Sequence, residues 1–192
     1  MGILVAGLVL FLGAHSVRIV ADDWRTRAIA RLGPGPWKGL VSLVSLVGLA
    51  LIVWGFGLAR AAPIQLWSAP PGMRHLAWLL TLAAFVLLAA AYLPGNHFKA
   101  WLHHPMVLAV QIWALAHLLV NGNLAHLVLF GSFLVWAACD LAAARRRDLA
   151  GQVVYPPGRW GPTLATLVTG VLAWAVFGLW LHGWLIGIRV MG

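Results

Sequence analysis

Three histidines lie in one apolar stretch of the chain, WLHHPMVLAVQIWALAHLLVNGN. His103 and His104 stand directly before Pro105, and His117 lies shortly before the Asn-Gly-Asn sequence. Pro105 suits the first turn of a helix, where its missing N–H is not needed. A glycine between two asparagines favours a helix end and a tight turn. The stretch therefore predicts a helix of about membrane width, and polar side chains in a membrane interior usually serve a function.

An imidazole inside a membrane bundle either hydrogen-bonds a neighbouring helix or binds a metal or cofactor. His15 and His117 are the main candidates, because each lies several residues inside an apolar stretch. Zinc is disfavoured by the absence of Glu, of an H-x-x-x-H spacing and of a nearby cysteine. His103 and His104 are expected to point about 100° apart on a helix, and so not to share one site. Packing and ligand roles both stay open from the residues alone.

The other titratable groups suggest little chemistry. His75, His97 and His182 lie at the ends of apolar stretches or in loops, and they are expected to have no functional role. His126 is interpreted as a surface residue one turn past the Asn-Gly-Asn sequence. Cys139 lies in an apolar run, where a thiol has no help to ionise, so we expect it to be inert.

The composition identifies the setting of these residues. The 192 residues are 62% hydrophobic and 9% charged, and no Glu is present, whereas a soluble domain is about a quarter charged. The chain is therefore predicted to be an all-α, polytopic membrane bundle that forms one domain over residues 1–192. The basic residues cluster between apolar stretches, which is typical of topology signals and contacts with anionic lipid. The expected partner is the bilayer, and nucleic acid is excluded.

Six transmembrane helices are predicted, because six apolar stretches each approach the roughly 20 residues needed to cross a bilayer. The stretches are 2–20, 39–59, 75–93, 104–120, 124–144 and 163–186. Polar or Pro/Gly-rich loops separate them, and the run Arg145-Arg146-Arg147 is expected to end the fifth. Asp140, an acid within a span, is near enough to Arg145 to form a structural ion pair.

The Lys and Arg residues predict the orientation. Ten lie on the side of loops one, three and five, and three lie on the opposite side, so both termini are expected to face the periplasm. The ten are Arg18, Arg25, Arg27, Arg31, Lys38, Lys99, Arg145, Arg146, Arg147 and Arg159, and the three are Arg60, Arg74 and Arg189.

Small residues predict close helix packing. They recur on one side of the first two stretches, which favours close approach of two helices over a functional groove. The residues are Gly2, Ala6 and Gly13 in the first stretch, and Ser45, Gly48 and Gly55 in the second.

A longer pattern connects these features to a family. The sequence H-P-M…W-A-L-A-H-L-L-x-N-G-N, followed by L-F-G-S-F-L-x-W-A, resembles the NnrU family of bacterial membrane proteins. That family is associated with nitrite and nitric-oxide reduction, and it is similar to plastid 15-cis-ζ-carotene isomerase. The resemblance covers essentially the whole chain and implies a haem b held by histidines. The isomerase's proposed ligands correspond to His15 and His117.

The predicted topology places these two imidazoles at different depths. At 1.5 Å per residue, His15 and His117 differ by roughly 10 Å along the bundle axis. His104, nearer the cytoplasmic side, is therefore the reserve partner for His15. Trp113 shares a helical face with His117, and Arg18 lies one turn from His15, where its charge suits haem propionates.

Two other functional classes share sequence features with this chain. The His104-Pro105 pair also resembles the start of the S-adenosylmethionine site of membrane isoprenylcysteine methyltransferases. Position 107 is Val, no Glu exists, and the segment 152–160 has one Tyr, so this class is disfavoured. The expected function is thus that of a haem b protein of the bacterial inner membrane in nitrogen-oxide metabolism. The alternative is cis–trans isomerisation of a hydrophobic polyene, with ferrous iron as a Lewis acid or one-electron partner.

Overall fold

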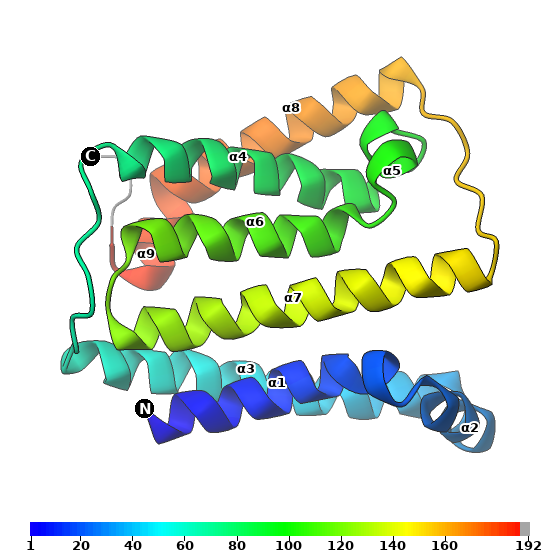
Figure 1. The fold of residues 1–192 in the computed structure, drawn as a ribbon, viewed down its shortest axis with the longest axis horizontal. Coiled ribbons are helices and arrows are strands. Elements are labelled where there is room, and N and C mark those ends of the chain that lie inside the picture. The colour runs from blue at the N-terminus through cyan, green and yellow to red at the C-terminus, as the bar shows by residue number, and fades with distance from the viewer. Residues whose placement is uncertain (189–192) are drawn as a thin grey trace.

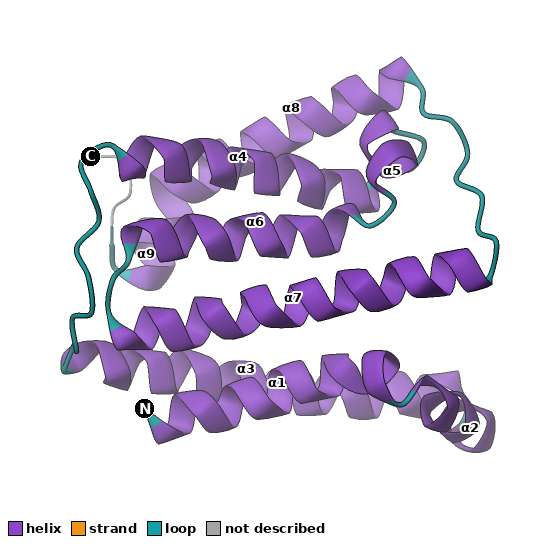
Figure 2. Ribbon diagram, in the orientation of Figure 1, coloured by secondary structure: helices purple, strands orange, loops and turns teal. Residues whose placement is uncertain are grey.

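Helices make up the regular structure of the described residues, 1–188, in the computed structural model (Figures 1 and 2). They are α1 (Gly2–Val20), α2 (Asp22–Leu32), α3 (Pro34–Ala61), α4 (Met73–Tyr92), α5 (His97–Leu102), α6 (Pro105–Val120), α7 (Leu124–Ala150), α8 (Trp160–Val176), the π-helical η1 (Phe177–Leu181) and α9 (His182–Ile186). The all-α prediction is confirmed for this part of the chain.

Five helical segments are long and apolar enough to cross a membrane, namely α1, α3, α4, α7 and the continuous run from α8 to α9. The predicted fourth crossing corresponds to α6, which is apolar but has only 16 residues. At 1.5 Å per residue α6 is about 24 Å long, shorter than the roughly 30 Å hydrocarbon core. Six crossings therefore remain a prediction, while a membrane bundle with five candidate spans is the finding.

Several predicted loops contain helix. The polar segment after α1 forms α2, whose first turn carries Asp22 and Asp23 and whose last turn carries Arg31. This charge order complements the helix dipole. The predicted end of the fifth span at residue 144 is not the end of the helix, because α7 continues through Arg145, Arg146 and Arg147 to Ala150. Arginine and alanine are good helix formers, so polarity here ends the apolar stretch but not the helix.

Helix α7 lies at the centre of the bundle (Figure 1). It packs against α6 on one side and against α1 and α3 on the other, while α4 packs between α6 and α8. The main core lies where α1, α3, α6 and α7 meet, and its buried residues are Leu4, Leu8, Ile52, Ala114, Leu129 and Phe130. Large apolar side chains also cover the outside of the bundle, as expected for a surface that faces lipid.

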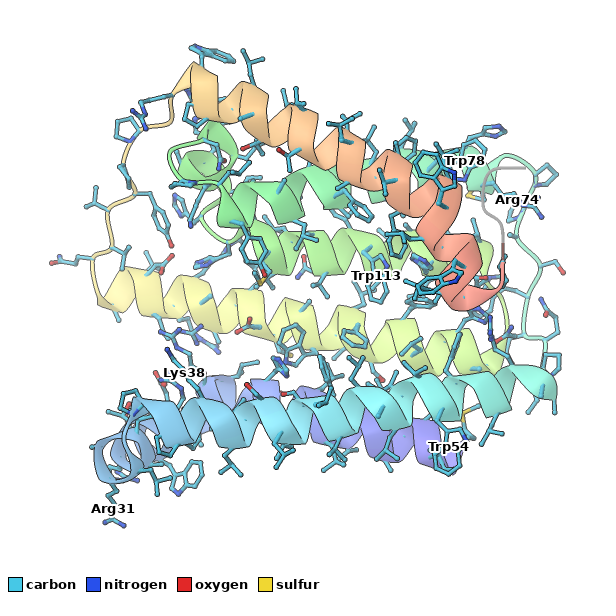
Figure 3. All side chains as sticks on the ribbon, turned by 180° about the vertical axis from the view of Figure 1, so that it is seen from behind. Arg31, Lys38, Trp54, Arg74, Trp78 and Trp113 are labelled. Atoms are coloured by element: carbon cyan, nitrogen blue, oxygen red, sulfur yellow. The ribbon has the colours of Figure 1, made fainter. Side chains whose placement is uncertain are left out.

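The bundle has two distinct ends. We call the end with α2, α5 and the segment 151–159 the inner end, and the end where α3 stops and α7 starts the outer end (Figure 1). Arg31 and Lys38 lie at the inner end, and Arg74 lies at the outer end (Figure 3). Arg189, which the prediction assigns to the side with three basic residues, lies outside the described residues.

Glycine allows α1 and α3 to touch along their backbones. A Cβ atom on Gly7 would lie 2.6 Å from the backbone nitrogen of Ile52, and one on Gly55 would lie 2.3 Å from that of Leu4. Gly48 meets Phe11 in the same way, so close packing at Gly48 and Gly55 is confirmed.

The prediction that Gly2, Ala6 and Gly13 form the packing face of the first stretch is wrong. Gly2, Ala6 and Gly13 are exposed, and a Cβ on Gly2 or Gly13 would meet nothing within 4 Å. The face that packs on α3 instead carries Leu4, Gly7 and the residues one turn further along, in the 3–4 spacing of a helix face.

A short bridge fixes the outer end. Leu66 donates its N–H to the carbonyl of Gly122 at 2.7 Å, and Leu124 donates to the carbonyl of Ile64 at 2.9 Å. A Cβ on Gly122 would lie 1.9 Å from the carbonyl oxygen of Trp67. Helix α6 thus ends at the Asn-Gly-Asn sequence, as predicted, with Asn121 as its C-cap. Gly122 leaves room for the segment that follows α3.

Candidate functional site

His117 lies half-buried near the outer end of α6. Its Nδ1 is 2.8 Å from the carbonyl oxygen of Trp113. A carbonyl oxygen only accepts, so Nδ1 carries the hydrogen and Nε2 is left with a free lone pair. The imidazole stacks on Phe130 at 4.4 Å between ring centroids and lies 5.2 Å from the ring of Trp113. The site therefore offers one oriented nitrogen ligand in aromatic surroundings.

His15 has the same local bond on α1. Its Nδ1 is 2.7 Å from the carbonyl oxygen of Phe11, and the two rings stack at 4.5 Å. The side chain is exposed on the bundle surface, with the ring of Trp136 edge-on at 6.1 Å. The buried Nε1 of Trp136 has no acceptor among residues 1–188. Chemically His15 is thus a second imidazole with Nε2 free, beside an unused N–H donor.

The structure does not bring His15 and His117 together. Between them lie the rings of Phe11, Phe133 and Trp113, with centroids 5.8 Å and 5.6 Å apart in that order. Within the described residues the backbones of α1 and α6 do not come close to each other, because α7 lies between the two helices.

The difference in depth between His15 and His117 can be read from their neighbours on α7. His15 lies beside Trp136 and His117 beside Phe130, which are six positions apart on this helix. At 1.5 Å per residue the two imidazoles are therefore separated by roughly 9 Å along the bundle.

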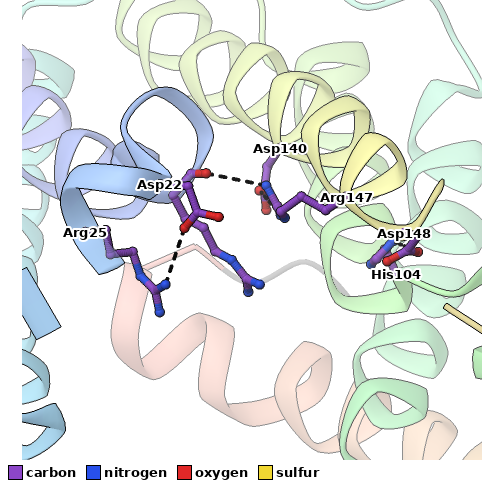
Figure 4. Close-up of polar contacts among 7 residues, drawn as sticks. Asp22, Arg25, His104, Asp140, Arg147 and Asp148 are labelled. Atoms are coloured by element: carbon purple, nitrogen blue, oxygen red, sulfur yellow. Dashed lines mark hydrogen bonds and ion pairs between the residues drawn. The ribbon is translucent and has the colours of Figure 1, made fainter. Parts of the chain in front are cut away.

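His104 is engaged by an acid at the inner end. Its Nε2 lies 2.7 Å from Oδ2 of Asp148 (Figure 4). Tyr155 donates its hydroxyl to the same oxygen at 2.9 Å. Burial, together with the hydrogen bond to Asp148, raises the pKa of Tyr155 to about 12. The reserve role of His104 as a haem ligand stays a prediction, and in this arrangement its Nε2 is already taken by a carboxylate.

His103 and His104 converge on one tyrosine. The ring of His103 stacks on Tyr155 at 4.0 Å and 1°, and that of His104 meets it edge-on at 6.2 Å. The expectation that the two cannot share a site is therefore wrong. Helical spacing does not apply to them, because His103 lies between α5 and α6 with φ 64°. With Lys99 they line a cavity of about 210 Å³.

Arg18 is exposed at the inner end of α1. Its carbonyl accepts from Nη1 of Arg147 at 3.5 Å, and Nη2 of Arg147 lies 3.7 Å from Oδ1 of Asp140 (Figure 4). The expected Asp140 pair with Arg145 is thus replaced by one with Arg147, two turns along the same face. The predicted contact of Arg18 with haem propionates stays a prediction.

His126 was missed by the sequence reasoning. It is 9% exposed rather than a surface residue, and its Nδ1 lies 2.6 Å from Oδ1 of Asn123, the residue that caps α7. Its ring packs edge-on to Phe56 at 5.1 Å and near-parallel to Phe130 at 5.9 Å. The available signal was its spacing of four residues before Phe130, which puts both on the buried face of α7.

The remaining histidines have local partners. The backbone N–H and Nδ1 of His97 contact Oγ1 of Thr163 at 3.0 Å and 2.8 Å, which ties α5 to α8. Nδ1 of His182 donates to the carbonyl of Ile188 at 2.7 Å.

Trp113 lies between the helices on the face seen in Figure 3. In the range 1–188, no group of three or more His, Cys, Asp or Glu side chains is placed to hold a metal ion.

Comparison with known proteins gives one match. The family described as NnrU protein matches residues 3–190, which is nearly the whole chain. No curated protein matches the chain, and no solved structure matches it.

Proposed function

The chain belongs to the NnrU family, and from this premise we propose that it binds haem b within the membrane and serves nitrogen-oxide metabolism. The sequence resemblance supports haem as the cofactor, and the geometry of the histidines supports the choice of binding site. The observation that carries it is the environment of His117, an oriented imidazole with a free Nε2 among apolar aromatic rings.

Haem suits this donor set. Haem would bring nitrogen ligands of its own and would need as few as one from the protein, so it would not require the three-residue cluster that a bare metal ion needs. A single histidine is enough in several haem proteins. His117 would therefore hold the haem iron, whereas His15 offers the same chemistry but lies on the far side of α7.

The residues around His117 have defined tasks in this proposal. The hydrogen bond from Nδ1 to the Trp113 carbonyl fixes the tautomer and holds the ring in place. Phe130 and Trp113 restrict the ring from two sides and exclude water from it. When bound, haem supplies one-electron chemistry and the binding of small diatomic molecules at iron, which no side chain supplies.

The test is the optical spectrum of the purified protein in detergent. A haem protein shows a Soret band, and a pyridine haemochrome assay identifies haem b. His117→Ala should lower the haem content by about tenfold or more, since loss of a ligand removes the principal bond to the cofactor. His75→Ala is the matched control, because His75 contacts Trp78 at the outer end of α4 and not the site.

Two results would contradict the proposal. One is a folded, colourless protein that takes up no haem when haem is added during expression. The other is an unchanged haem content in His117→Ala when that variant elutes as the same monodisperse species as the parent protein. The second result would make His117 a packing residue.

A further inference from the structure

The outer end carries a cavity that the haem proposal does not use. It lies between the end of α3, the segment after it and the start of α7, with a volume of about 610 Å³. This volume is within the range of roughly 300–1,000 Å³ found for small-molecule sites. Its polar lining residues are Arg60, Gln65, Asn123 and His126.

Arg60 is held in a fixed position at this cavity. One nitrogen, Nη2, donates to the carbonyl of Ile186 at 3.3 Å, and the guanidinium carbon lies 5.1 Å from the ring centroid of Phe56. Its Nε is buried, and no acceptor for it exists among the described residues. The guanidinium is thus oriented by two contacts, while its Nε–H has no acceptor in this part of the chain.

Within residues 1–188, the charge of Arg60 also has no acidic partner. The four acidic side chains of the sequence are Asp22, Asp23, Asp140 and Asp148, and all lie in the inner halves of their helices or in α2. A partly buried guanidinium is costly unless an anion pairs with it. Beside it, His126 gives its Nδ1 hydrogen to Asn123, and its Nε2 has no hydrogen-bond partner among the residues that the structure describes.

We infer that this cavity binds an oxyanion of the carboxylate class through Arg60. The planar guanidinium, with N–H groups in one plane, matches a carboxylate better than a spherical ion. Two sources provide this chemistry, namely a small carboxylate solute from the outer aqueous phase and a carboxylate arm of a larger membrane-bound molecule such as haem. The first source is independent of the proposed function, and the second rests on it.

A thermal-shift titration tests the first source. The protein in non-ionic detergent is titrated with sodium acetate, with sodium chloride at equal ionic strength as the reference. Acetate should raise the unfolding midpoint in a saturable way, beyond the effect of chloride. Arg60→Gln should weaken this response by about tenfold or more, the value of a charge-assisted hydrogen bond. Arg74→Gln is the matched control, since Arg74 is an outer-end arginine that does not line the cavity.

A haem-ester comparison tests the second source. Haem and its dimethyl ester, which lacks carboxylate charges, are added to haem-free protein and their binding is followed by absorbance. If a haem carboxylate occupies the cavity, haem binds at least about tenfold more tightly than the ester, and Arg60→Gln removes the difference. Arg60→Lys, which keeps the charge but lacks Nε, should lie between the two in either experiment, and it serves if Arg60→Gln fails to fold.

The two proposals fail separately. If the protein binds acetate but takes up no haem, the haem proposal is contradicted and the anion-site proposal is supported. No saturable acetate response, together with no preference for haem over its ester in the unsubstituted protein, overturns the anion site. Arg60 would then be a surface-anchoring residue whose side chain reaches toward water.

Discussion

His104 and Asp148 join the start of α6 to the end of α7 through a 2.7 Å contact between Nε2 and Oδ2, although 44 residues separate them. Tyr155 donates to the same carboxylate oxygen, so the segment after α7 is held against the turn between α5 and α6. The ring of His103 stacks on the ring of the same Tyr155. One carboxylate therefore organises the inner end.

Asp148→Asn should loosen this end without unfolding the bundle. The substitution removes the charge that accepts from His104 and Tyr155, and hydrogen bonds to charged groups contribute about 1.5–3 kcal/mol each before screening. We expect faster amide hydrogen exchange in the segment 151–159 and a lower unfolding midpoint. Asp23→Asn is the control, because Asp23 is an exposed acid on α2. Equal exchange in the two variants would show that the carboxylate does not hold the segment.

The raised pKa of Tyr155 predicts a loss of stability at high pH. Its pKa is about 12 in the folded protein and about 10 in an unfolded chain, so the folded state holds the proton more tightly. The stabilisation is fully present below pH 10 and is lost as the pH rises toward 12. Tyr155→Phe should remove this part of the pH dependence and also the late step in the tyrosinate absorbance titration. A wild-type titration complete near pH 10 would contradict the assignment.

The sequence predicts the helices well where apolarity alone determines them, and less well at their ends. The apolar stretches locate α1, α4 and α7, because burial or lipid contact requires their composition. The polar helix α2 and the last turns of α7 resemble loops in hydropathy, since arginine is both highly polar and a good helix former. Helix ends of this kind are decided by capping and charge order rather than by hydrophobicity.

Some of the site residues can likewise be predicted from the sequence, and others cannot. His15 and His117 can be selected from the sequence, because each imidazole stands alone in an apolar stretch and bonds only to its own helix. The Asp148–His104 contact and the cavity at Arg60 could not be predicted, because their members come from segments far apart in the chain. Only tertiary packing places them side by side, and no local spacing signals it.

Glycine contact between α1 and α3 gives a stability prediction. Gly55→Ala places a methyl group against the backbone of Leu4, where neither helix can give way, so the helices must separate. We expect destabilisation of about 1–3 kcal/mol, as for other overpacked sites. Gly13→Ala is the matched control on the open face of α1, and it should be neutral or stabilising by up to about 1 kcal/mol. The measurement is the unfolding midpoint in detergent, and equal midpoints would exclude close packing at Gly55.

The basic residues predict the orientation in the membrane. With ten Lys and Arg residues assigned to one side and three to the other, both termini should face the periplasm. A reporter that is active only in the cytoplasm should be silent when fused at Gly192 and active when inserted at Gly151, beside the arginine run. A silent reporter at both sites would indicate a misfolded fusion, so expression of full-length protein is checked alongside. Activity at Gly192 with silence at Gly151 would reverse the topology.

The separation of His15 and His117 predicts the coordination state of a bound haem. Their neighbours on α7 lie six residues apart, roughly 9 Å along the bundle, and three aromatic rings lie between them. One iron therefore receives His117 alone in this arrangement, and the ferric spectrum should be high-spin. His15→Ala should leave both spectrum and haem content unchanged, whereas His117→Ala removes the haem. A low-spin spectrum that becomes high-spin in His15→Ala would instead show that both histidines bind one iron. In that case α1 moves past α7 when haem binds, and the pairing implied by the family resemblance is correct.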